Sequence, residues 1–286
     1  MTACLMVVSR LAWIVVALVA VWAYLRWFEW RNLYYPSRTV ETTPSTLGLD
    51  YEDVTFISED GRVLRGWWIP HKQARGTVLH CSGNAGNIGD RVGLAADLHR
   101  LAVNVFLFDY RGYGESRGVP TERGTYADAR AAYEVVRARY RDADDPPVIL
   151  HGQSLGGGVA IQLALDKPVR ALVIESAFPS TVDMALHVYP WLPVRAMCHF
   201  KYDSLSKVGS VRIPKVFAHS RDDEMIPYEL GRKLYEAAAE PKQFCELEGL
   251  HNDTGWSTNP EYWKAVEQLV RRVFGEPGAG PGGGVQ

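Results

Sequence analysis

A serine flanked by glycines carries the clearest chemical signal in this sequence of 286 residues. Residues 152–156, GQSLG, match the pattern G-x-S-x-G, in which the serine stands on a sharp turn between a strand and a helix. A phosphate-binding loop would instead need a lysine after the glycines. The nearest lysine, Lys167, lies about three helical turns further along the chain. The spacing therefore predicts that Ser154 is a nucleophile.

A nucleophilic serine needs a general base, and the base needs a carboxylate to orient it. In chains with this turn, the acid and then the histidine follow the serine. The four histidines after Ser154 are His187, His199, His219 and His251. We favour His251 because it follows the last apolar run, whereas His219 precedes the acid candidates and the other two lie in an expected cap.

The acid is expected in the loop before that base, at residues 219–227, HSRDDEMIP. Asp222, Asp223 and Glu224 compete there, and a carboxylate without a catalytic role would be solvated or would cap a helix. Asp223 stands at the position relative to the following Ile-Pro pair that such loops usually give the acid. Glu175, at the end of an earlier apolar run, is the second choice.

Acyl transfer also needs donors for the oxyanion that forms on the substrate carbonyl. The backbone N–H of Leu155 should be one donor, because this residue follows the nucleophile. The second donor is expected in the loop 80–91, where Gly83 allows close approach and the N–H of Asn84 is favoured. By itself this loop would be better explained as an ordinary turn, and it is the candidate triad that favours the donor.

The elements that must position these residues alternate between short apolar runs and helical patterns. Such alternation predicts a mostly parallel sheet with helices on both faces. The first two runs lie close together and indicate an antiparallel hairpin at the sheet edge. Residues 125–140 show helical spacing of their apolar side chains. The eight predicted strands are 53–58, 64–70, 76–82, 104–110, 147–152, 171–176, 215–220 and 243–248.

Segment 176–214, which is rich in aromatic residues and proline, interrupts this alternation. We interpret it as a small cap over the C-terminal edge of the sheet, with a plain helical crossover as the alternative. The Gly- and Pro-rich end, residues 275–286, is typical of a disordered tail. The chain is thus divided into an N-terminal anchor, one α/β domain over 31–274, and a tail.

The anchor is predicted over residues 1–30. Its centre, residues 11–25, is an uncharged and mostly apolar run, and with its flanks it approaches the roughly 20 residues that span a bilayer. A cleaved signal peptide is the alternative, but a bulky Trp22 in the cleavage-like site argues against it. More arginines follow the run than precede it, which weakly favours a cytoplasmic domain behind a single-pass anchor.

The overall composition excludes some function classes. A hydrophobic content of 47% and a formal net charge of −2 fit a globular protein and give no electrostatic footprint for nucleic acid. The four cysteines are scattered without metal-ligand or disulfide spacing. We expect neither a metal nor an organic cofactor, and we expect an acylated or other small-molecule substrate and a membrane as partners.

Several further motifs occur in a fixed order along the chain. These are LYYPSR (33–38), SGNAGNIGDR (82–91), VFLFDYRGYGESRGVPTERGTYADARAAY (105–133), GQSLGG (152–157), ESAFPS (175–180), HSRDDEMIP (219–227) and GLHNDT (249–254). With them the chain resembles the α/β-hydrolase family, in particular the membrane-tethered serine hydrolases that include depalmitoylases and lipid hydrolases. The resemblance extends over about residues 33–270.

The resemblance implies an α/β-hydrolase fold, a catalytic triad of Ser154, Asp223 and His251, and oxyanion donors at Leu155 and Asn84. It also implies that DYRGYGES (109–116) is a structural loop, in which we expect Asp109 and Arg111 to form an ion pair. One departure concerns Ser82-Gly83, where members of the family usually have His-Gly.

The resulting hypothesis is a serine hydrolase that cleaves esters or thioesters, with acyl or lipid-like substrates, through an acyl-enzyme on Ser154. A serine peptidase with the same triad and a non-catalytic, membrane-tethered binding protein are the alternatives.

Overall fold

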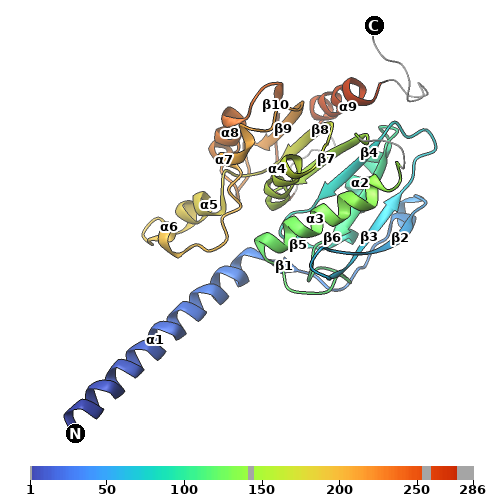
Figure 1. Cartoon of the computed structure of the whole chain (residues 1–286). Coiled ribbons are helices and arrows are strands. Elements are labelled where there is room, and N and C mark those ends of the chain that lie inside the picture. The colour runs from blue at the N-terminus through green and yellow to red at the C-terminus, as the bar shows by residue number, and fades with distance from the viewer. Residues whose placement is uncertain (1, 141–144, 253–258, 276–286) are drawn as a thin grey trace.

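The eight apolar runs of the sequence form the eight strands of one sheet in the computed structural model, which describes residues 2–140, 145–252 and 259–275 (Figure 1). Its strand order is β10-β9-β8-β7-β4-β6-β3-β2. The strands are β2 (Glu52–Ile57), β3 (Val63–Ile69), β4 (Thr77–Cys81), β6 (Asn104–Asp109), β7 (Val148–Gln153), β8 (Ala171–Glu175), β9 (Lys215–Ser220) and β10 (Lys242–Leu247). Most of the expected tail, residues 276–286, lies outside the described residues.

The sheet is parallel from β6 to β10, and β3 pairs antiparallel with both β2 and β6. The predicted edge hairpin and the predicted, mostly parallel sheet are thus confirmed. Parallel pairing brings the carboxyl ends of β4, β7, β8, β9 and β10 to one edge, where loops from separate parts of the chain meet. A smaller two-stranded sheet pairs β1 (Tyr35–Pro36) with β5 (Ala85–Gly86).

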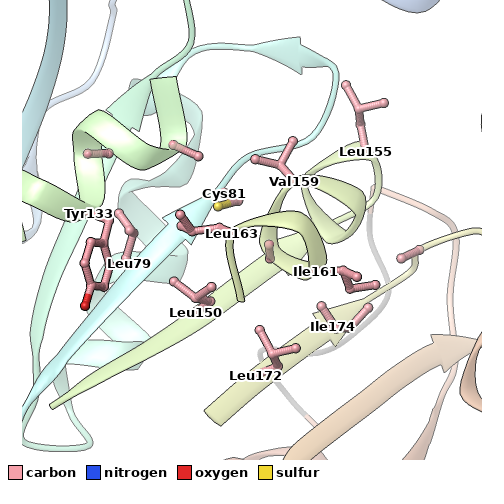
Figure 2. Close-up of a cluster of buried hydrophobic side chains, with 14 of the residues drawn as sticks. Leu79, Cys81, Tyr133, Leu150, Leu155, Val159, Ile161, Leu163, Leu172 and Ile174 are labelled. Carbon is pink, nitrogen blue, oxygen red and sulfur yellow. The ribbon is translucent and has the colours of Figure 1, made fainter. Parts of the chain in front are cut away.

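Helices cover both faces of the large sheet. One apolar layer is closed by α2 (Val92–His99) and α9 (Pro260–Phe274), and the other by α3 (Glu122–Arg137), α4 (Leu155–Asp166) and α8 (Tyr228–Ala237). Figure 2 shows part of the second layer, where side chains of α4 and α3 gather with those of β4, β7 and β8. Because every side chain labelled there is fully or almost fully buried, α4 is held rigidly against the strands that precede and follow it.

The predicted helix 125–140 begins and ends three residues earlier, as α3. Thr121 accepts a hydrogen bond from the N–H of Gly124 and so caps a start at Glu122. Of the apolar face expected there, Ala129, Tyr133 and Val136 are fully buried, whereas Tyr126 and Tyr140 are half-buried against the same core. Periodicity identified the helix, whereas its start depended on a capping side chain outside the periodic pattern.

Helix α1 (Thr2–Leu33) extends away from the sheet and meets the rest of the chain near its C-terminal end (Figure 1). Its segment Arg10–Leu33 contains an 18-residue window with a mean hydropathy of 1.9 and is long enough to cross a membrane. Beside the end of α1 lie α5 (Thr181–Val188) and α6 (Val194–Met197), both within the segment expected to form a cap. The same segment continues into α7 (Leu205–Val208), and two single-turn 3₁₀ helices occur at Pro44–Leu47 and Ile88–Arg91.

Candidate active site

Ser154 stands on a strained turn between the last residue of β7 and the first residue of α4. Its backbone has φ 53° and ψ −121°, a conformation that costs a residue with a side chain on the order of 1–3 kcal/mol. Two bonds hold it: its N–H donates to the carbonyl of Glu175 at 2.8 Å, and its carbonyl accepts the N–H of Gly157 at 2.9 Å. The turn therefore presents a serine at the edge where the parallel strands end.

The flanking glycines are required by space rather than by chain flexibility. A Cβ at Gly156 would lie 2.0 Å from the carbonyl oxygen of Cys81, and one at Gly152 would lie 2.6 Å from that of Gly156. Glycine at both positions thus lets α4 start in direct contact with the end of β4. This contact brings the loop after β4 next to Ser154, since a Cβ at Gly83 would be 3.5 Å from the Ser154 Cβ.

The structure brings His251 and Asp223 together, although 28 positions separate them in the chain. The distance from His251 Nδ1 to Asp223 Oδ2 is 2.8 Å, and Oδ1 of the same carboxylate accepts the N–H groups of Met225 and Ile226 at 3.0 and 2.7 Å. Burial raises the pKa of Asp223, but the hydrogen bonds from His251 and Ile226 outweigh burial and hold the pKa below its ordinary value. An ionised carboxylate only accepts, so Nδ1–H donates and Nε2 keeps a free lone pair.

The other acids of this loop have different partners. Glu224 accepts the backbone N–H of His251 at 2.7 Å, and Asp222 lies 3.5 Å from the N–H of Gly249. Gly249 has φ 96°, a conformation that favours glycine, and it bends the chain toward His251. Of the three competing acids, Asp223 is thus the one whose carboxylate meets the imidazole.

His219 lies behind Asp223 and has a supporting position that the sequence did not reveal. Its Nε2 is 2.9 Å from the carbonyl oxygen of Ile226 and 3.4 Å from Asp223 Oδ2. Burial lowers the pKa of His219, so this histidine is neutral near pH 7. Its contacts hold the acid loop in place.

A pocket of about 500 Å³ joins the favoured residues. Ser154, Leu155, Asn84 and His251 all line it, and Asp223 sits directly behind His251. The remaining wall is mostly apolar and comes from α1, α5, α6 and the acid loop, with side chains that include Leu25, Phe28, Leu33, Phe178, Met184, Ala185, Val188, Leu192, Val194, Met197, Met225 and Ile226. Its size falls within the range of about 300–1,000 Å³ that is usual for small-molecule sites.

Asn84 is fixed by contacts with three other segments. Its side chain donates to the carbonyl of Leu33 at 2.8 Å, and its own carbonyl accepts the N–H of Tyr35 at 2.9 Å and the hydroxyl of Tyr113 at 2.7 Å. The loop therefore has a defined position even though Ser82 stands where the resemblance leads us to expect a histidine.

Glu175, the second choice for the acid, lies beneath the turn rather than in the pocket. Its Oε2 is 3.3 Å from the Tyr262 hydroxyl and 3.4 Å from His151 Nε2, and His151 Nδ1 is 3.0 Å from His80 Nδ1. The side chains of this group are fully buried. Its imidazole partner is thus His151, not His251.

The expected ion pair between Asp109 and Arg111 is wrong. Arg111 instead pairs with Asp128 at 2.8 Å and with Asp60 at 2.7 Å, because its side chain is directed toward α3 and the β2–β3 hairpin. Asp109 ends β6 and accepts the N–H of Ile88 at 2.9 Å. Burial raises the pKa of Asp109 to about 7. The loop is structural, as expected, but its ionic partners come from segments that lie far away in the sequence.

Two histidines of the expected cap, His187 and His199, are exposed and do not line the pocket. Among the described residues, no three His, Cys, Asp or Glu side chains are grouped in a way that could hold a metal ion.

Comparison with known proteins gives one consistent family. A family model described as serine aminopeptidase, S33, matches residues 72–198. The α/β-hydrolase domain-containing protein WAV2 of Arabidopsis thaliana is 32% identical over 276 residues, which cover 87% of this chain and 89% of that protein. An uncharacterized membrane protein of Saccharomyces cerevisiae is 31% identical and covers 86% of this chain and 91% of its own length.

Among solved structures, the esterase Pf2001 of Pyrococcus furiosus superposes with a TM-score of 0.70 at 23% identity. The match covers 85% of this chain and 98% of that one. At this identity the superposition establishes the fold.

Proposed function

This chain belongs to the α/β-hydrolase family, and from that premise we propose that it is a serine hydrolase that cleaves carboxylic esters or thioesters through an acyl-enzyme on Ser154. The observation that carries the proposal is the 2.8 Å contact between His251 and Asp223 beside a pocket that His251 shares with Ser154. A strained nucleophile, an oriented imidazole and an ionised acid are the parts that acyl transfer needs.

In the proposed mechanism, Nε2 of His251 takes the proton of the Ser154 hydroxyl as the oxygen attacks the substrate carbonyl. Asp223 holds the imidazole in the productive tautomer and stabilises the imidazolium. His251 then protonates the leaving group, and it later activates the water that releases the acyl group from Ser154. The carbonyl oxygen is negatively charged in the intermediates on both sides of the acyl-enzyme.

The oxyanion donors in this proposal are the backbone N–H groups of Leu155 and Asn84. The N–H of Leu155 is at the first turn of α4, where helical N–H groups have no acceptor within the helix. The side chain and carbonyl of Asn84 are committed to protein partners, so its N–H is the group available to a substrate oxygen. No metal or organic cofactor enters the mechanism.

The apolar lining of the pocket supports an acyl or lipid-like substrate. The relation to membrane-tethered depalmitoylases and lipid hydrolases that we expect from the sequence fits this substrate class, and so does the name of the Pyrococcus esterase.

A serine peptidase is the second candidate, because the matching family model is described as a serine aminopeptidase. Turnover of matched acyl esters, acyl thioesters and aminoacyl amides by the full chain in detergent separates the candidates. We expect ester or thioester turnover that Ser154→Ala abolishes. Faster turnover of the amides would favour the peptidase, and turnover that Ser154→Ala retains would overturn the proposed nucleophile.

We further propose that residues 1–30 form a single-pass membrane anchor and that residues 31–274 form the hydrolase domain, with 176–214 as its cap. The apolar stretch of α1 supports the anchor, as does the description of the yeast relative as a membrane protein. Protease protection of the domain in sealed vesicles tests the cytoplasmic orientation that the arginines after the apolar run favour.

A further inference from the structure

The membrane-directed helix and the pocket share a wall. Leu25, Phe28 and Leu33 of α1 line the same pocket as Ser154 and His251. These three residues come from the last turns of the helix that carries the candidate membrane span. A helix that served only as a tether would have no reason to contribute to the site.

Polar contacts fix this end of α1 to the cap. Glu29 Oε1 accepts the N–H groups of His199 and Phe200 at 2.7 and 2.8 Å. Arg26 pairs with Glu29 at 3.2 Å and donates to the carbonyl of Met197. Because these bonds join residues about 170 positions apart, the wall and the cap hold a defined relative position.

Two further contacts fix α1 to the hydrolase domain. The Trp30 indole N–H donates to the carbonyl of Pro120 at 3.0 Å, and the carbonyl of Leu33 accepts the side-chain amide of Asn84 at 2.8 Å. The second bond connects α1 directly to the proposed oxyanion loop. Displacement of α1 would therefore disturb both the pocket wall and this loop.

The position of the wall along α1 puts it at the membrane surface. Residues 10–24 are all exposed, and cover by the protein begins at Leu25. A bilayer core takes about 20 helical residues. A span that begins after Arg10 would end near residue 30, and a span that stops where protein cover begins would end at residue 24. The first span puts Leu25–Trp30 in its last turns and Leu33 just beyond it, and the second puts all of Leu25–Leu33 at the interface.

Exposed apolar side chains of the cap lie beside the last turns of α1. Trp191 is 73% exposed and Val188 is 48% exposed. Tyr189, between them, contacts the ring of Phe28 on α1. Tryptophan and tyrosine favour the headgroup region of a bilayer, so the cap beside α1 has the composition of a surface that touches lipid.

We infer that the last turns of α1, Leu25–Leu33, are a substrate-binding element: they form one wall of the acyl site, and the acyl chain of a bilayer-resident ester passes from the membrane into the pocket along this wall. The inference rests on the proposed function and adds to it a class of substrate, esters with a long acyl chain held in the membrane, and a route to Ser154.

The test compares two substitutions to tryptophan at adjacent positions of the full chain in lipid nanodiscs. Leu25→Trp adds bulk to the pocket wall, whereas Tyr24→Trp adds it on the exposed face of the same turn. The measured quantity is the ratio of kcat/KM for p-nitrophenyl palmitate to that for p-nitrophenyl butyrate. We expect Leu25→Trp to lower this ratio by about tenfold or more and Tyr24→Trp to change it less than about twofold.

If the palmitate-to-butyrate ratio of kcat/KM is the same in both variants, and a fluorophosphonate labels Ser154 in them as fully as in the wild type, the inference is overturned and the proposed function stays intact. If the wild type neither hydrolyses the esters nor is labelled at Ser154, the proposed function is overturned instead.

A second measurement uses the unmodified chain and so avoids a variant that fails to fold. A hexadecyl fluorophosphonate with a diazirine in its alkyl chain reacts with Ser154: the Oγ–P bond forms, fluoride leaves, and the proton passes to His251. Irradiation then attaches the alkyl chain of the probe covalently to the residues that surround it. We expect adducts within residues 25–33, and adducts on other pocket residues but none on this segment would contradict the inference.

Discussion

Two of the buried histidine–carboxylate pairs near the nucleophile turn, His251–Asp223 and His151–Glu175, differ in their access to the pocket. In one pair, His251 Nδ1 is 2.8 Å from Asp223 and His251 also lines the pocket with Ser154. In the other, His151 Nε2 is 3.4 Å from Glu175, and both residues are fully buried. The second imidazole has its other nitrogen 3.0 Å from His80.

Pairing with a carboxylate does not by itself make a histidine a general base. A general base needs a free lone pair within reach of the proton that it abstracts. In the first pair Asp223 occupies one nitrogen and leaves Nε2 free, whereas in the second both nitrogens of His151 have protein partners. The first pair can therefore do chemistry, and the second supports the turn from below.

The largest expected difference in kcat is between variants of His251 and of His151. His251→Gln should lower kcat for ester hydrolysis by about 10⁵-fold or more, because the serine loses its base. His151→Gln should lower stability and leave kcat of the folded fraction within about tenfold. Initial rates, normalised to folded protein from thermal unfolding, check both, and equal losses of kcat would remove the distinction between the pairs.

The next largest difference in kcat is expected between variants of Asp223 and of Glu175. Asp223→Asn should lower kcat by about 10⁴-fold, since the imidazole then adopts the wrong tautomer. Glu175→Gln is the matched change in the buried pair, and we expect it to act on stability. Should Glu175→Gln cause the larger loss of kcat, the acid would have to be reassigned to the end of β8.

His219 gives a smaller and more specific effect. It lies 3.4 Å from Asp223 and fixes the acid loop through Ile226, so His219→Asn should lower kcat about tenfold with little change in KM. Steady-state kinetics on one ester is sufficient. A rise in KM without a fall in kcat would show that His219 shapes the pocket instead.

The smallest effect concerns the pH dependence of stability and His80, the buried histidine beside His151. Burial holds the pKa of His80 well below its ordinary value, so the native state keeps it neutral while the unfolded chain takes up a proton below about pH 6.5. Stability should thus fall with decreasing pH in this range, and His80 contributes up to about 1.4 kcal/mol per pH unit.

Denaturant unfolding of wild type and His80→Asn between pH 5 and 7 checks this contribution. We expect the slope of unfolding free energy against pH to be shallower in the variant. Parallel slopes would mean that His80 is protonated, or exposed, in the folded protein.

The sequence predicted the parts of the fold that local patterns encode. Apolar runs identified the eight strands of the large sheet but not the short β1 and β5, and the glycines around Ser154 predicted a turn that the structure contains, because their spacing reflects a local steric need. Asp223 could be favoured over its neighbours because loop chemistry within a few residues distinguishes them. The assignment of catalytic roles to these residues stays a prediction.

Contacts between distant segments were not predictable in the same way. The pairing of Arg111 with Asp128 rather than Asp109 depends on where α3 packs, and the wall formed by α1 depends on its contacts with segment 176–214. No spacing within α1 distinguishes Leu25 from the exposed apolar residues before it. Only the charged pair Arg26 and Glu29, three residues apart in an otherwise apolar stretch, could have indicated that this end has protein partners.

The most direct test of the account is to map the site of fluorophosphonate attachment by peptide mass spectrometry. Wild type, Ser154→Ala and Ser176→Ala are compared, because Ser176 is a second buried serine with positive φ. We predict a single adduct on Ser154 in wild type and in Ser176→Ala, and none in Ser154→Ala. An adduct at another residue, or equal labelling of Ser154→Ala, would contradict the central claim that Ser154 is the nucleophile.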